Sequence, residues 1–131
     1  EDKRVRFVFK EFPILSDTSR LAAKAALAIW RSHPDKYHDY HMGLLQTQQR
    51  VTEGLIRQQV EKLGLKWDEI KQAAKAPDIE RNIDSNTTLA EKLGINGTPS
   101  FIVGERLFPG YVPYDVLERA IESACKTSER C

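Results

Sequence analysis

The fold of this chain is decided by residues 93–104, which read LGINGTPSFIVG. Gly94 follows an apolar stripe of helical period and marks the end of that helix. The β-branched and aromatic run Ser100–Val103 predicts a strand. A tight turn and a second short strand at residues 107–108 complete a predicted antiparallel hairpin. The pattern therefore changes from helical to extended at the loop of residues 97–99.

Four or five helices are predicted before this loop and one after it. Ser16 or Asp17 caps the first helix, which is rich in alanine and runs to about Ser32. The expected starts of the others are Pro34, Thr52, Trp67, Pro77 and Asp115.

The residues before the first helix predict one more strand. Val5–Phe12 reads VRFVFKEF and carries apolar side chains on both faces of an extended chain. Pro13 ends it, because proline cannot donate to a strand ladder. A strand, a helical block and then a hairpin plus helix is an α/β order, with the first strand expected to run parallel to a hairpin strand.

Composition and motifs argue against several classes of function. Lys and Arg number 20 against 19 Asp and Glu, a net charge of +1, so no nucleic-acid partner is expected. No apolar run approaches the roughly 20 residues of a membrane span. No phosphate loop or nucleophile elbow occurs, and no cofactor is predicted. His38 and His41 share a helical face but have no obvious third ligand, so no metal site is predicted.

Two stretches resemble one known family. Residues 93–104 are similar to the cis-proline loop and following strand of the thioredoxin fold. Residues Phe9–Leu15 (FKEFPIL), the alanine-rich residues 21–28 and residues 37–41 (YHDYH) are similar to the entry into the inserted helical domain of DsbA-like thiol:disulfide oxidoreductases. The match covers nearly the whole chain in order. It implies an α/β thioredoxin-like fold with an inserted helical domain, missing the first β-strand and the active-site helix.

This resemblance divides the chain into three segments. Residues 1–15 would supply a thioredoxin-fold strand, and residues 16–92 mainly the inserted helical domain. Residues 93–131 would supply the cis-proline loop, the hairpin and the C-terminal helix.

The resemblance also implies a substrate-binding role for Gly97, Thr98 and Pro99. A cis bond before Pro99 would leave the backbone of Thr98 open to pair with an extended polypeptide. The alternative is a plain turn that precedes a strand.

The cysteines do not fit the family's chemistry. Its redox pair is a Cys-x-x-Cys at a helix N-terminus, where the helix dipole lowers the thiol pKa. No Cys-x-x-Cys occurs here, so no catalytic residue is predicted in this chain. Cys125 and Cys131 are expected to be non-catalytic, and a disulfide between them would contribute about 2 kcal/mol.

Two functions remain open at this point. The resemblance implies part of a periplasmic or otherwise extracytoplasmic protein that forms or isomerises disulfides in protein substrates, inactive as these 131 residues alone. The alternative is a non-catalytic thioredoxin-fold module that binds extended polypeptides. A glutathione-dependent isomerase has no specific support.

The missing first strand has a consequence for partners. Its absence would leave strand edges open. An N-terminal piece, a partner chain, a homo-oligomer or a swapped dimer is expected to fill the gap. The chain begins with Glu1 rather than methionine, which predicts that it is processed or cut from something longer.

Overall fold

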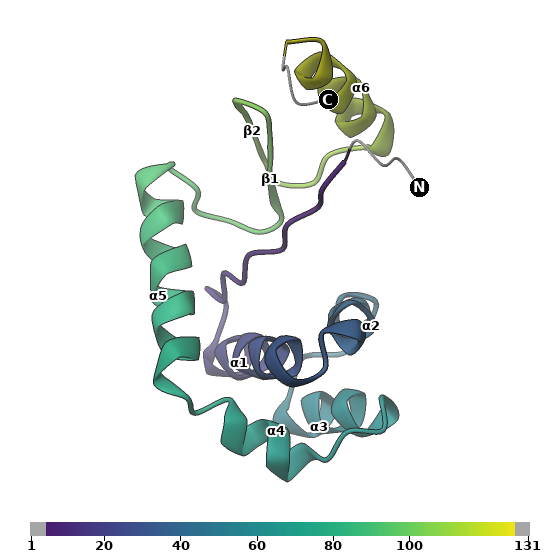
Figure 1. The fold of residues 1–131 in the computed structure, drawn as a ribbon, viewed down its shortest axis with the longest axis vertical. Helices are drawn as coiled ribbons and strands as arrows, with labels where there is room; N and C mark the ends of the chain where they lie inside the picture. The colour runs from purple at the N-terminus through teal and green to yellow at the C-terminus, as the bar shows by residue number, and fades with distance from the viewer. Residues whose placement is uncertain (1–4, 128–131) are drawn as a thin grey trace. The chain divides into compact units, whose positions relative to one another are not determined.

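The computed structural model describes residues 5–127 and contains six helices and two strands there (Figure 1). The helices are α1 (Asp17–Ser32), α2 (Pro34–Leu45), α3 (Glu53–Lys62), α4 (Trp67–Ala73), α5 (Pro77–Lys92) and α6 (Tyr114–Thr127). The strands are β1 (Ser100–Val103) and β2 (Arg106–Pro109). This order confirms the predicted helical block, hairpin and final helix. None of these helices is long and apolar enough to cross a membrane.

The chain divides into two compact units. The helical unit comprises residues 11–88, and the hairpin unit joins the described parts of residues 1–10 and 89–131. α1 to α4 belong to the helical unit, while β1, β2 and α6 belong to the hairpin unit. The segment boundaries that the sequence predicts, at residues 15/16 and 92/93, stay a prediction.

The helical unit is built around α1. Ser16 caps this helix in a capping box: its side chain accepts a hydrogen bond from the Ser19 N–H, and the Ser19 hydroxyl accepts one from the Ser16 N–H. Ala25 and Ala28 are buried on its inner face. Such small side chains let neighbouring helices approach closely, and α1 contacts α2, α3 and α4.

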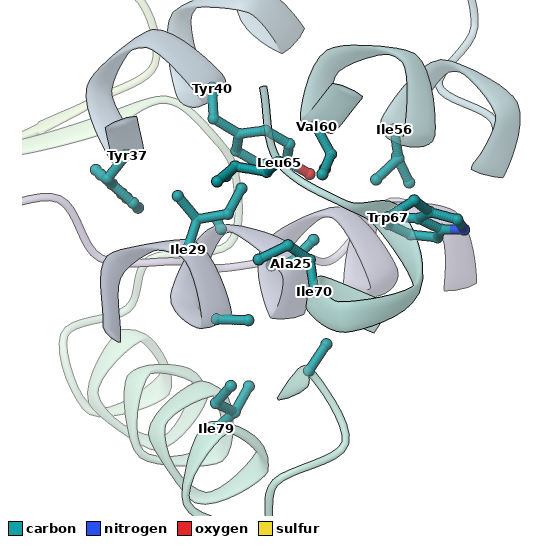
Figure 2. Close-up of a cluster of buried hydrophobic side chains, with 14 of the residues drawn as sticks. Ala25, Ile29, Tyr37, Tyr40, Ile56, Val60, Leu65, Trp67, Ile70 and Ile79 are labelled. Atoms are coloured by element: carbon teal, nitrogen blue, oxygen red, sulfur yellow. The ribbon is translucent and has the colours of Figure 1, made fainter. Parts of the chain in front are cut away.

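The core of this unit lies between these helices (Figure 2). Ile29, Tyr40 and Ile56 are almost completely buried. Burial of one isoleucine side chain stabilises the fold by roughly 1.5–3 kcal/mol. Trp67 is a core residue and is 5% exposed, whereas Trp30 is 55% exposed.

Ion pairs connect α1 to α5 along the surface. Glu80 accepts from both Arg20 and Lys24, and Arg20 also pairs with Asp84 at 2.9 Å. Arg31 pairs with Asp78 at 2.8 Å. The basic residues Arg20, Lys24 and Arg31 of α1 are thus matched by acidic residues of α5.

The strand predicted at Val5–Phe12 is not formed. Its described residues belong to no helix or strand, and the sheet of the described chain consists of β1 and β2. A strand requires a hydrogen-bonded neighbour, whatever the propensity of its residues. Without one, Phe7 is 62% exposed and Val8 is 58% exposed.

The hairpin packs one face against α6. The strands pair antiparallel, with Phe101 opposite Phe108 and Ile102 opposite Leu107. Because side chains alternate along a strand, these two pairs lie on opposite faces. β1 contacts α6, and a Cβ placed on Gly104 would come within 3.1 Å of the Ala124 Cβ.

Candidate functional site

The predicted substrate loop begins where α5 ends. Gly94 has a φ of 68°, a left-handed conformation that glycine adopts without steric cost. The Ile95 N–H then bonds back to the Ala90 carbonyl at 2.8 Å, and the Gly94 N–H bonds to the Glu91 carbonyl at 3.1 Å. Such a glycine-based C-cap stops the helix and turns the chain toward the loop.

The loop itself presents Thr98 and Pro99 to solvent. The peptide bond between them is cis, and both residues are exposed. Gly97 is half-buried, but its conformation is not left-handed and an added Cβ would meet nothing within 4 Å. The Ser100 hydroxyl donates a hydrogen bond to the Gly97 carbonyl at 2.9 Å.

β1 continues from this loop with one unpaired edge. Two residues, Gly104 and Glu105, connect β1 to β2, and Val103 pairs with Arg106 across that turn. In such a ladder, alternate residues direct their backbone groups away from the partner strand. The N–H and C=O of Ile102 and Ser100 are therefore directed to the outer edge, where no third strand of the described chain pairs with them.

A shallow groove lies on the exposed face of the hairpin. Its volume is about 290 Å³, and its lining residues are Leu93, Ile102, Gly104, Glu105 and Leu107. Ile102 is 53% exposed although it is a strand residue. An open strand edge beside a bare apolar face is a surface to which an extended polypeptide can add as a strand.

The helical unit holds a second cluster of polar groups around Glu11. The Tyr37 hydroxyl donates to the Glu11 carboxylate at 2.7 Å, and His41 Nδ1 lies 3.6 Å from the same oxygen. Asn86 donates to the Glu11 backbone carbonyl at 3.0 Å. Burial, together with the charge of Glu11, raises the pKa of the Tyr37 hydroxyl, which therefore stays protonated as a donor.

The two histidines considered as metal ligands lie in different surroundings. The His41 side chain is 22% exposed beside Glu11, whereas that of His38 is 66% exposed and lies 3.7 Å from Asp39. No group of three or more His, Cys, Asp or Glu side chains in residues 5–127 could hold a metal ion.

The predicted cysteine pair falls partly outside the described residues. Cys125 lies in the last turns of α6, whereas Cys131 lies beyond residue 127. The disulfide between them stays a prediction.

Two residues near these sites escape prediction from the sequence. Glu11 stands in an apolar stretch, and that interruption is the one signal that it is held by polar partners. Ser100 follows Pro99 directly, but its bond to Gly97 depends on the path of the loop, which the sequence pattern does not define.

Known proteins match this chain over most of its length. The family model for the DSBA-like thioredoxin domain matches residues 1–122. Disulfide bond formation protein D of Bacillus subtilis is 26% identical over 128 residues, which cover 93% of this chain and 58% of the relative. The chain thus spans somewhat under two thirds of that relative's length.

Solved structures of thioredoxin-like proteins are also similar to this chain. A thioredoxin-like oxidoreductase from Silicibacter pomeroyi is 35% identical, with a TM-score of 0.86 over 92% of this chain and 69% of that one. A periplasmic thioredoxin-like protein from Salmonella enterica serovar Typhimurium is 32% identical, with a TM-score of 0.77 over 89% of this chain and 64% of that one. These matches confirm the thioredoxin-like fold predicted from the sequence.

Proposed function

This chain belongs to the DSBA-like thioredoxin family, and we propose that it is the polypeptide-binding part of a thiol–disulfide oxidoreductase that forms or isomerises disulfides in protein substrates. One observation carries the proposal: the exposed loop Gly97–Pro99 leads directly into the unpaired edge of β1. A substrate strand would pair there through its backbone, so that many sequences could bind.

The chemistry requires a thiolate that attacks a disulfide sulfur and forms a mixed disulfide. That thiolate is not supplied by a Cys-x-x-Cys of these 131 residues, since none occurs. In this proposal the redox cysteines lie on a strand–helix unit outside the given sequence. The contribution of this chain is to hold the substrate backbone in place during the exchange, which lowers the entropic cost of the reaction.

The same proposal places the protein in the periplasm or another extracytoplasmic compartment. Disulfides form and persist in such oxidising compartments. The periplasmic assignment of the Salmonella relative supports this location. Its partners there would be proteins with free thiols or incorrect disulfides.

The test compares the chain alone with a fusion that carries a strand–helix unit bearing Cys-x-x-Cys before Glu1. We expect the fusion to re-oxidise reduced ribonuclease A in a glutathione buffer, and the chain alone to leave the uncatalysed rate unchanged. A fusion with both added cysteines replaced by serine is the control. A fusion that remains inactive while its cysteines form a disulfide would contradict the proposal.

A binding assay separates this reading from the alternative of a non-catalytic module. Lactalbumin that is kept unfolded by carboxymethylation has no thiol to exchange, so its binding reports the polypeptide surface alone. If the lactalbumin binds to the chain but the fusion is inactive, the non-catalytic module is favoured. Absence of binding would remove the basis of both readings.

A further inference from the structure

Ser100 stands between the exposed loop and β1, and its hydroxyl donates to the Gly97 carbonyl at 2.9 Å. We infer that Ser100 is a positioning residue, which occupies the Gly97 carbonyl and so directs an extended polypeptide to pair at Thr98. This inference rests on the proposed function, because it concerns how the same loop receives its substrate.

Little else fixes the loop. Gly97 has no left-handed conformation to impose a turn, and its Cα faces open space. Within the described chain, the bond from Ser100 is the one hydrogen bond that reaches residues 96–99. The hydroxyl therefore restrains a segment that would otherwise sample several conformations.

The nearby end of the hairpin adds only weak restraint. Ser100 lies opposite Pro109, and its backbone N–H and C=O are directed to the outer edge of β1 rather than across the ladder. The first pair that exchanges cross-strand hydrogen bonds is Phe101 with Phe108, one residue further from the loop. The hydroxyl of Ser100 is thus the hydrogen-bonding group of this residue that holds the loop to the strand.

The bond also determines which backbone acceptor a polypeptide meets. A backbone carbonyl oxygen has two lone pairs, and one that already accepts a hydroxyl hydrogen has a single lone pair left for a second donor. With Gly97 occupied, the next backbone groups along the exposed loop are those of Thr98, and no described residue bonds to them. Without the hydroxyl, the backbone groups of both Gly97 and Thr98 would be open to the polypeptide. The polypeptide could then pair in either of two registers.

The test measures binding of carboxymethylated lactalbumin to the complete 131-residue chain by calorimetry. We expect Ser100→Ala to weaken binding about five-fold, the effect of one hydrogen bond of ordinary strength, and Ser100→Thr to restore it, because threonine keeps the hydroxyl and suits a strand. Ser32→Ala is the matched control: it removes a hydroxyl-to-carbonyl bond of the same length, to Ala28, in the helical unit.

Amide hydrogen exchange of the unbound protein separates a local role of Ser100 from a loss of the hairpin fold. We expect the protected amides of β1 and α6 to exchange at the parent rate in Ser100→Ala. Weaker binding with unchanged exchange in β1 and α6 supports the inference. Binding by Ser100→Ala as tight as that of the parent chain overturns it, even if exchange changes. If the parent chain itself does not bind, the proposed function fails and this inference fails with it, whereas the result for Ser100→Ala alone leaves the proposed function standing.

Discussion

Gly97 and Gly104 differ in whether the fold requires a glycine at that position. Gly104 has a φ of 59°, and an added Cβ would lie 3.1 Å from the Ala124 Cβ. It is required by the fold, for both conformation and space. Gly97 has neither requirement, since its conformation is ordinary and its surroundings are open. A glycine without a structural need, in an exposed loop, fits a place where another backbone approaches closely.

Gly97→Ala is therefore expected to leave the free energy of unfolding within about 0.5 kcal/mol of the parent value, but to weaken binding of carboxymethylated lactalbumin. The matched control Gly104→Ala is expected to cost roughly 1–2 kcal/mol, because a left-handed alanine is strained. Urea unfolding followed by circular dichroism measures stability, and calorimetry measures binding. Unchanged binding by Gly97→Ala would remove Gly97 from the site.

Asn86 is a buried polar residue of α5 that contacts Glu11, the first residue of the helical unit. It is 8% exposed and donates to the Glu11 carbonyl at 3.0 Å and to the Asn82 side chain at 3.2 Å. Asn86→Ala is expected to destabilise the chain by about 1–3 kcal/mol, because a part-buried carbonyl loses its donor. Urea unfolding measures the loss. Asn82→Ala, at an exposed position, should cost less than about 0.5 kcal/mol, and equal effects of the two changes would contradict this account.

Single residues were predictable where a local rule governs them. Gly94 and Ser16 follow the rules for helix ends, and both cap helices as expected. Thr98 and Pro99 were predicted by resemblance, and the structure places both in an exposed loop. The contacts of Glu11 and Ser100 depend on where the chain goes next, so no local pattern predicts them.

At the scale of elements, charge joins α1 to α5. The contacts with Lys24 and Arg20 lower the pKa of Glu80 below its ordinary value of 4.5. The other charged group beside Arg20 is Asp84. A carboxylate with a depressed pKa in the folded state stabilises the fold above its unfolded pKa. This stabilisation is lost as the pH falls through the folded pKa.

Glu80→Gln is accordingly expected to lower stability at pH 7 by no more than about 1 kcal/mol for each ion pair, because Glu80 lies at the surface and water screens these pairs. The difference from the parent chain should shrink as the pH falls below 4.5. Urea unfolding from pH 7 to pH 3 provides the measurement. Glu91→Gln, on an exposed part of α5, is the control and should show no such convergence. A difference that stays constant with pH would mean that charge is not the cause.

The helices and strands also show where a sequence pattern is sufficient to predict secondary structure. The helices follow from apolar periodicity and caps, which act within a few residues, and all six lie where those signals predict them. The run at Val5–Phe12 has an equally strong β pattern, yet no strand forms. Helical hydrogen bonds are internal to the segment, whereas those of a strand depend on a neighbour that the run cannot provide.

At the scale of the whole molecule, several large apolar side chains of the hairpin unit are exposed. Phe7 and Val8 are more than half exposed, as is Ile102. Leu93 and Leu107 are 43% and 40% exposed on the hairpin groove. Exposed apolar side chains favour association, because each contact removes them from water. The unpaired edge of β1 adds backbone groups that a second chain can satisfy.

We therefore expect the 131-residue chain to self-associate in solution, which is one of the alternatives that its open strand edges leave. Sedimentation velocity between about 5 and 200 μM should give a sedimentation coefficient that rises with concentration, and the double change Phe7→Ser with Ile102→Thr should reduce that rise. Leu15→Ser is the matched control, since Leu15 is 81% exposed in the helical unit. It should leave association unchanged. A folded chain that sediments as a monomer over the whole range would show that these apolar groups need no partner.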